Sequence, residues 1–482
     1  MYKINKQMSI EDFIFPYGKL KPSNRWVIMA GLIPWDDIER DYAEGFVNNG
    51  APAHPARMAL GSLIIKQILG CSDEELVCQV AENPYLQFFV GLKEFSEECP
   101  FGASTLVAFR KRFTEKDIAS VNDLMLKRAR DRADNDKDGD DEGGSSEKTM
   151  ALDATVAPSD IAYPQDIKLL NDAREHLEAI IDFICGQTGS PKPRTYRKTA
   201  RKDFLNWSKS KKPSTKKVRA ALRKQLGYVG RDLRHMDALV GKLNPELTRR
   251  QLELLATITS LYAQQRYMYE NKVHSVPDRV VSIAQPWVRP MVRGKTSANV
   301  EFGAKCEVST DEGFARIEHT SFDAYNESEG LIPAVESYCI RNGFYPDRLL
   351  VDKIFRTRKN LAWCKDRDIR ISGPRLGRPP KDDQATRKQK ATEERDAADR
   401  NVVEGVFGTA KVVYGLDPVR ARLEETTKTV IGLAILVFNL RKLLAASLSQ
   451  SLGALISLLR DTIRHLLDWW QVAATNFQLV TE

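Results

Sequence analysis

One short stretch combines an acid, two cations and an aromatic side chain at helical spacing. If residues 400–411 form a helix, four side chains share one of its faces, namely Arg400, Glu404, Phe407 and Lys411. A core-facing stripe would be apolar, so this composition is unusual for a core helix, and it would indicate chemistry once partners for Glu404 are found elsewhere in the chain. The acid can hold a divalent metal ion, and the cations can hold phosphates. The alternative is a solvated helix with an Arg400–Glu404 ion pair.

Two glycines, Gly405 and Gly408, interrupt the same stretch. Each costs a helix about 1 kcal/mol relative to alanine, so helix propensity does not account for them. They would let another backbone or a nucleic acid approach the helix closely.

Two further acids lie in apolar, strand-like segments. Asp153 interrupts the alternating segment 149–158, and Asp352 ends the segment 347–352. A carboxylate in a buried strand is costly unless something pairs with it, so we interpret both acids as ligands. The alternative for Asp153 is a turn at a strand end.

Together with Glu404, these acids form a possible oxygen donor set. Carboxylates prefer Mg²⁺ or Mn²⁺, and two such ions about 4 Å apart can assist an in-line phosphoryl displacement. The chain has only 6 histidines, which fits Mg²⁺ better than Zn²⁺. Physical reasoning alone does not single out these three acids among 65.

The elements that would position these acids alternate between strand and helix. Short strands are expected at 149–158, 280–283, 300–308, 314–319, 347–352 and 369–371. Helices are expected at 331–342, closed by Gly343, at 359–366, and through Glu404. A turn at 311–313 joins two of the strands. The order predicts an α/β domain with a mixed sheet flanked by helices.

Bulk composition bounds the class of protein. The chain has 482 residues, with 73 Lys and Arg against 65 Asp and Glu, a net charge of +8. This excess is compatible with nucleic-acid binding. The 7 cysteines include no C-x-x-C pair, which argues against a structural zinc site. No apolar signal region or run of about 20 apolar residues occurs. We therefore expect a soluble, intracellular protein.

Short helices with tight turns precede the first strand. Arg110 and Arg112 lie on one of them. These helices resemble a helix-turn-helix-like DNA-binding module, and a plain helical bundle is an equal alternative. The acidic, Gly/Ser-rich segment 134–148 reads as a flexible linker.

A highly charged helical insertion separates the first strand from the others. Its cations include Lys198, Arg201, Lys211, Lys212, Lys216 and Lys217, interleaved with aromatic residues. Such a mixture can contact phosphates and stack on bases. The alternative is a solvated helical hairpin. Two apolar helices, 426–444 and 452–470, would pack against the sheet or form a dimer contact.

The sequence resembles the insertion-sequence DDE transposases, in particular the group with a Y-(2)-R-(3)-E-(6)-K signature. Arg400, Glu404 and Lys411 match its spacing, while position 397, where the Tyr would fall, is Ala. Further matching stretches are Leu152–Val156, Val300–Lys305, Asp352–Arg358 and Gly373–Pro379.

The resemblance implies an RNase H-like catalytic core in which Asp153, Asp352 and Glu404 hold two Mg²⁺ or Mn²⁺ ions. Arg400 and Lys411 would hold phosphates. Arg356 and Arg358 would either do the same or form a solvated patch. The implied domains are a helical DNA-binding domain (1–133), the linker (134–148), a split core (149–165 and 276–425), the basic insertion (166–275) and C-terminal helices (426–482).

The implied activity is cutting of the element's DNA ends and joining of their 3′-OH groups to target DNA. The expected partner is double-stranded DNA, bound by a homodimer in the bacterial cytoplasm, at the nucleoid, with no membrane involved. Two alternatives remain: a transposase-derived DNA-binding protein that no longer cuts, and an RNase H-like nuclease that cuts without joining.

Overall fold

The computed structural model describes residues 9–16, 18–46, 52–135, 147–292, 300–374 and 383–450. The expected linker at 134–148 lies mostly outside these residues, as do the expected helix at 452–470 and part of the matching stretch 373–379.

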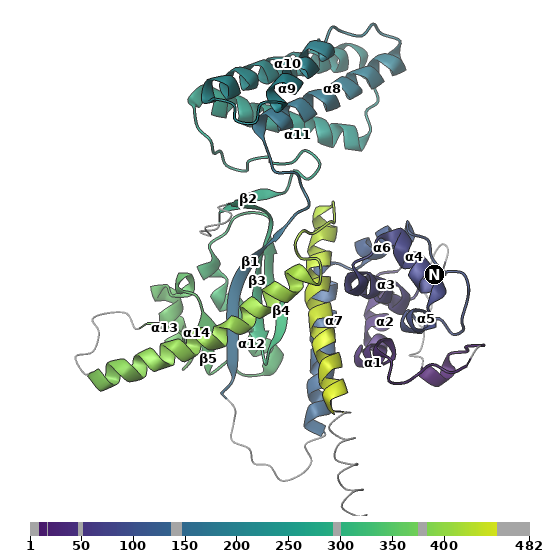
Figure 1. Ribbon diagram of the computed structural model, residues 1–482, viewed down its shortest axis with the longest axis vertical. Coiled ribbons are helices and arrows are strands. Elements are labelled where there is room, and N and C mark those ends of the chain that lie inside the picture. The colour runs from purple at the N-terminus through teal and green to yellow at the C-terminus, as the bar shows by residue number, and fades with distance from the viewer. Residues whose placement is uncertain are drawn as a thin grey trace, which may run out of the picture.

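The chain begins with a group of helices (Figure 1). They are η1 (Ile10–Asp12), α1 (Arg25–Leu32), α2 (Trp35–Glu44), α3 (Ala56–Leu69), α4 (Asp73–Glu82), α5 (Pro84–Phe89), α6 (Thr105–Arg112) and α7 (Glu115–Asn135). Local sequence explains several of their ends. Gly70 closes α3 in the left-handed conformation at φ 64°. The Ser72 side chain accepts the Glu75 amide hydrogen and so begins α4.

Six strands form one mixed sheet. They are β1 (Thr149–Pro158), β2 (Arg289–Val292), β3 (Val300–Asp311), β4 (Phe314–Ser321), β5 (Arg348–Val351) and β6 (Arg370–Ile371). The order is β2-β3-β1-β5-β6, and β4 also pairs with β3. β3 runs antiparallel to β1, whereas β5 runs parallel to it. The mixed α/β architecture expected from the sequence is therefore present.

The expectation of a strand at 280–283 is wrong, because this segment is irregular. The Val280 amide donates to the Gln264 side chain instead of to a neighbouring strand. Val280 and Ile283 are buried against helices that precede them. The segment thus has the composition of a strand, but its apolar side chains are buried against helices. The next strand in the chain is β2, which begins at Arg289.

The β3–β4 hairpin confirms the expected turn. Its connection is Glu312 and Gly313, both with positive φ (53° and 76°), as a two-residue hairpin turn requires.

Helices cover both faces of the sheet, and successive side chains of β1 point alternately to the two faces. On one face, Met150 and Leu152 pack with α12 (Leu331–Asn342) and α13 (Arg358–Lys365). On the other face, Ala151 packs beneath Val403 of α14 (Asp383–Val412). Asp153 shares the face of Ala151. The sheet alternation therefore directs this acid towards α14.

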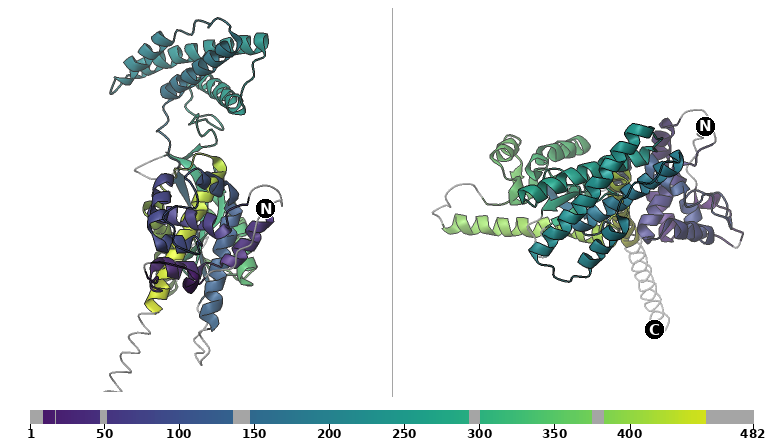
Figure 2. Two further views of the ribbon diagram at one scale, coloured as in Figure 1. Left: turned by 90° about the vertical axis from the view of Figure 1, so that its right-hand side faces the viewer. Right: turned by 90° about the horizontal axis from the view of Figure 1, so that it is seen from above.

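A helical bundle is inserted between β1 and β2. It consists of α8 (Asp166–Thr188), α9 (Arg197–Ser208), α10 (Thr215–Leu243) and α11 (Arg249–Asn271). It has its own core, which includes Leu177, Val229 and Leu261. Figure 1 shows the bundle beyond one end of the sheet, and Figure 2 shows the same separation from a second side.

A long helix, Glu424–Gln450, packs between the N-terminal helices and the sheet. The Asn439 side chain donates to Asn122 of α7 and to the Ala315 carbonyl of β4. The helix is long and apolar enough to span a membrane by length and composition, but 67% of its most apolar window is buried inside the protein. Core packing therefore explains its apolar character, and the expectation that it packs against the sheet is confirmed.

Candidate active site

Asp153 lies on β1, and the exposed Asp352 directly follows the neighbouring strand β5, at the equivalent position of the parallel ladder. Leu152 pairs with Val351 in the parallel β1–β5 ladder, and each acid follows one of these residues. Asp153 Oδ1 accepts the Ala154 amide at 2.8 Å. The Asp352 carboxylate likewise accepts the amide of the residue that follows it, at 2.6 Å. The fold thus brings together two acids that are 199 residues apart (352 − 153).

The carboxyl group of Asp153 is largely withdrawn from water, with a side chain 19% exposed. This burial raises its pKa above the ordinary value, because the charged form loses hydration. The Ala154 amide and Arg400 oppose the rise, whereas the negative charges of Asp352 and Glu327 add to it. Burial is thus the main reason why this carboxyl group holds its proton more readily than a free aspartate.

Helix α14 brings Arg400 and Glu404 over these strands. Val403, on the same helix, is fully buried against the sheet. Arg400 Nη1 lies 3.4 Å from Asp153 Oδ2, and its Nη2 lies 3.7 Å from Glu404 Oε1. The Glu404 side chain is 58% exposed. The guanidinium therefore lies between the strand acid and the helix acid.

The three acids are neighbours but do not form a closed cluster. Within the described ranges, no group of three Asp, Glu, His or Cys side chains is close enough to hold a metal ion. Asp153 is turned towards Arg400, and Glu404 is mostly in solvent. A metal ion contacting all three would require these side chains to move.

The other cations expected beside the acids have different surroundings. Lys411 is partly buried. Burial raises the pKa of the Cys306 thiol on β3, and the positive charge of Lys411 partly opposes this rise. Arg356 donates to the carbonyls of Ser372 and Pro374 and so holds the segment after β6. Arg358 begins α13 and is exposed. Of these three, Arg358 is the most accessible to a phosphate.

Arg110 has a structural environment in the N-terminal helices. Its guanidinium forms two hydrogen bonds to Asp73 at 3.0 and 2.6 Å. This bidentate pair joins α6 to α4, so Arg110 fixes the packing of these helices.

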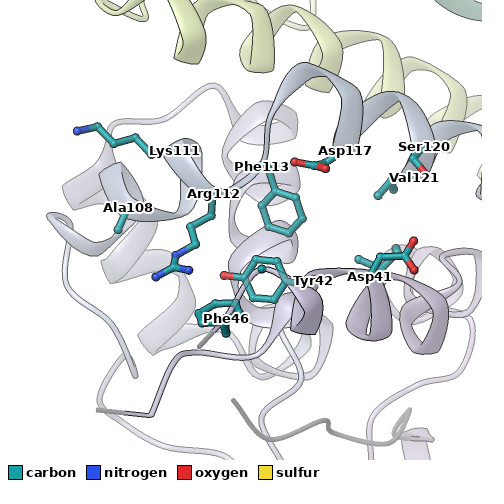
Figure 3. A pocket seen from close by; sticks show the side chains of 12 residues that line it. Asp41, Tyr42, Phe46, Ala108, Lys111, Arg112, Phe113, Asp117, Ser120 and Val121 are labelled. Atoms are coloured by element: carbon teal, nitrogen blue, oxygen red, sulfur yellow. The ribbon is translucent and has the colours of Figure 1, made fainter. Parts of the chain in front are cut away.

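Arg112 lies at the surface of a cavity of about 550 Å³ between α2, α6 and α7. Its guanidinium is 4.1 Å from the Phe46 ring centroid. Figure 3 shows Arg112 beside Phe46 and Tyr42, with Lys111 further along α6. The contact with Phe46 restricts the orientation of the Arg112 guanidinium. The side chain is nevertheless exposed, so the guanidinium edge can still contact an anion.

The six cations expected to bind DNA in the insertion are all exposed. Lys198 and Arg201 lie on α9, Lys211 and Lys212 connect α9 to α10, and Lys216 and Lys217 are in the first turn of α10. Cations are unfavourable at a helix N-terminus, where the macrodipole is positive. This arrangement therefore concentrates positive charge at one end of the bundle, where a phosphate would be stabilised.

Sequence reasoning missed two further acids, Glu307 and Glu327. Glu327 forms an ion pair with Lys305 at 2.8 Å, and its charge reaches Asp153. Glu307, on β3 opposite Ala154, is 1% exposed. Burial, followed by the charge of Glu327, raises the pKa of Glu307 to about 7. An acid within an apolar strand was the signal used for Asp153, and it applied equally to Glu307.

The chain is similar to known transposase sequences. A model described as a transposase DDE domain matches residues 349–441, and a model described as a transposase domain (DUF772) matches residues 16–112. A Rhizobium meliloti protein, described as uncharacterized ORF8 in the nfe locus, is 32% identical over 158 residues. The aligned part is 33% of this chain and 73% of that relative. No solved structure matches the chain.

The matched ranges include part of the features described above, whereas Asp153 and the inserted bundle lie outside both. Residues 349–441 carry Asp352, Arg400 and Glu404, and residues 16–112 cover helices α1 to α6. These matches indicate a DNA transposase, a class that generally uses divalent metal ions. The chain belongs to the insertion-sequence DDE transposases.

Proposed function

We propose that this transposase cuts the ends of its own element and joins them to target DNA through metal-assisted phosphoryl transfer. The observation that carries the proposal is the placement of Asp153 on β1 beside Asp352, which follows the parallel strand β5, with Glu404 on the helix α14 that packs over these strands. The mixed sheet, in which β3 runs antiparallel and β5 parallel to β1, supports an RNase H-like core.

Asp153, Asp352 and Glu404 would hold two Mg²⁺ or Mn²⁺ ions. Carboxylate oxygens fit these hard cations. When bound, such ions supply Lewis-acid stabilisation to the attacking and leaving oxygens. Glu404 is mostly exposed, and its side chain would turn towards the other two acids to share an ion with them.

In the first step, a water oxygen would form a bond to phosphorus at the element's end. The bond from phosphorus to the 3′ oxygen breaks, and that oxygen takes a proton to become a 3′-OH. In the second step, this 3′-OH attacks a target phosphodiester, and a target 3′ oxygen leaves. The nucleophile is water or DNA, so no covalent protein–DNA intermediate forms.

The chain's own cations would position the DNA. Arg400, Lys411 and Arg358 would contact phosphates near the acids and offset the charge that develops there. Gly405 and Gly408 support this placement, because no atom lies within 4 Å of the position a Cβ would take at either glycine. This side of α14 can therefore be approached closely by a DNA backbone.

The parts of the chain would divide this work. Residues 1–133 would bind DNA, and residues 149–165 with 276–425 would form the core. The insertion 166–275 would hold DNA through its exposed cations, and the described part of the C-terminal region 426–482 packs against the N-terminal helices and the sheet. Two ends must be cut together, so we propose that a homodimer assembles on double-stranded DNA.

The first test is cleavage of labelled DNA that carries the element's own termini. Wild type is expected to cut at the terminus with Mg²⁺ and not with EDTA, and Asp352→Asn should lose this cleavage while still binding DNA. Asp366→Asn changes an exposed acid at the end of α13 and is the matched control. Normal cleavage by Asp352→Asn would overturn the assignment of this acid.

The same reactions separate the alternative functions. Binding without cleavage, in Mg²⁺ and Mn²⁺ alike, would indicate a DNA-binding descendant that no longer cuts. Cleavage without joined products would indicate a nuclease that lacks strand transfer.

A further inference from the structure

Arg400 occupies the space between two of the acids that would bind metal. Its Nη1 is 3.4 Å from Asp153 Oδ2, and its Nη2 is 3.7 Å from Glu404 Oε1. The side chain is only 25% exposed, although it is a charged residue on a surface helix. One guanidinium thus spans both carboxylates.

The backbone position of Arg400 is fixed by contacts one turn earlier on α14. Asp396 is 4% exposed and accepts hydrogen bonds from Arg348 of β5 and Arg370 of β6. Val403, three residues after Arg400, is fully buried. Because both flanks are anchored, Arg400 can leave the acids only by rotating its own side chain.

A metal ion and this guanidinium compete for the same oxygens. A bound Mg²⁺ lies about 2.1 Å from each ligand oxygen, so an ion on Asp153 Oδ2 would face the Arg400 Nη1 across a short distance. Two cations so close repel each other strongly in a partly buried site. One of them must leave before the other binds fully.

We propose that Arg400 is the built-in counter-ion of the metal-free acids, and that metal binding displaces its guanidinium, which then binds a DNA phosphate. The inference rests on the proposed function, because it takes Asp153 and Glu404 as metal ligands. Arg400 would thus pair first with the acids and then with a DNA phosphate.

This exchange couples metal binding to DNA binding. A phosphate that captures Arg400 removes the competitor of the metal, and a metal that displaces Arg400 frees it for the phosphate. Such coupling is reciprocal by thermodynamic necessity. The acids would therefore bind metal weakly alone and more tightly once DNA is in place.

The test is calorimetric titration of the full chain with Mn²⁺ alone, without DNA. Arg400→Gln should bind Mn²⁺ about tenfold more tightly than wild type, as expected for a typical coupling of this kind. Its melting temperature without metal should fall, because the acids lose their counter-ion. Lys390→Gln removes a cation of the same helix that is 77% exposed and has no place in the proposed site, and it should change Mn²⁺ affinity less than about twofold.

A second variant guards against misfolding of Arg400→Gln. Arg400→Lys keeps the charge, but a single ammonium cannot span both carboxylates, so its Mn²⁺ affinity should lie between those of wild type and Arg400→Gln. Addition of duplex DNA should tighten Mn²⁺ binding by wild type and leave Arg400→Gln nearly unchanged.

Two different failures can be told apart. Unchanged or weaker Mn²⁺ binding by both Arg400 variants would overturn the counter-ion role and make Arg400 a residue that positions the acids. Mn²⁺ binding that persists unchanged in Asp153→Asn would instead show that the proposed metal site itself is wrong.

Discussion

At the scale of single residues, Glu307 is the acid most at odds with its surroundings. It is 1% exposed, and its Oε1 has no hydrogen-bond partner among the described residues. The Glu307 carboxylate occupies space beside Gly330, because a Cβ atom at position 330 would overlap the carboxylate. A buried, incompletely paired carboxyl favours its protonated form. The protein therefore accommodates this acid at a cost that depends on pH.

We expect Glu307→Gln to change the pH dependence of stability. The unfolded chain ionises this group near its ordinary pKa of 4.5, whereas the folded protein holds the proton up to about pH 7. Wild type should therefore lose stability as pH rises from about 4.5 to 7, and the variant should not show this loss. The difference at pH 8 is at most about 3 kcal/mol in favour of the variant.

Urea unfolding at pH 4.5 and pH 8 measures this difference. Glu97→Gln, which alters an exposed acid, should behave as wild type at both values. Equal stability of wild type and Glu307→Gln at pH 8 would contradict the expected burial of a charged group.

At the scale of elements, the position of α14 depends on one buried ion-pair network. Arg348 and Asp396 are each 4% exposed, with their nearest atoms 2.6 Å apart. Asp396 also accepts from Arg370, and Arg348 also contacts Asp399 at 2.7 Å. The network joins the helix that carries Arg400 and Glu404 to the strand that leads into Asp352.

Asp396→Asn should destabilise the protein by about 3 kcal/mol, because it leaves the buried Arg348 without its main partner. Glu394→Gln is the control. Glu394 is 70% exposed and 4.0 Å from Lys390, so the loss should be about 0.5 kcal/mol or less. Thermal unfolding of both variants measures the two effects, and equal losses would show that the buried network does not hold α14.

Local patterns predicted the elements that carry the site. The alternation of β1 assigned Asp153 to the face of Ala151, and positive-φ residues closed the β3–β4 turn and α12 where expected. The sequence could not reveal the contact of Lys305 with Glu327, since it depends on how β3 meets the short 3-10 helix Glu327–Glu329, which begins 22 residues later (327 − 305). The 280–283 segment misled for the same reason, because its burial partner is a helix.

At the scale of the whole molecule, the basic bundle stands apart from the rest of the protein (Figure 1). Its core is separate from the core shared by the N-terminal helices and the sheet. The exposed cations at one end of α10 can therefore contact DNA without disturbing the packing around the acids.

Replacing Lys211, Lys212, Lys216 and Lys217 together with Gln should weaken DNA binding and reduce its salt dependence. Each lost phosphate contact lowers the slope of log affinity against log salt by about 0.9, so the reduction should be about 2 to 4. Arg249→Gln with Arg266→Gln, on exposed positions of α11, is the control. Binding measured from 50 to 300 mM salt gives both slopes, and equal slopes would exclude the α10 end as a DNA contact.

The contacts of the Glu424–Gln450 helix have a consequence for the timing of synthesis. Thr429 donates to the Phe113 carbonyl, and Asn439 donates to Asn122, across 316 and 317 residues of sequence. Ribosomes add roughly 5–20 residues per second, so α6 and α7 wait roughly 15–60 s for these partners. Chains interrupted before this helix would lack part of the core around the N-terminal helices. The cell would therefore obtain a competent transposase only from translation that continues through this helix.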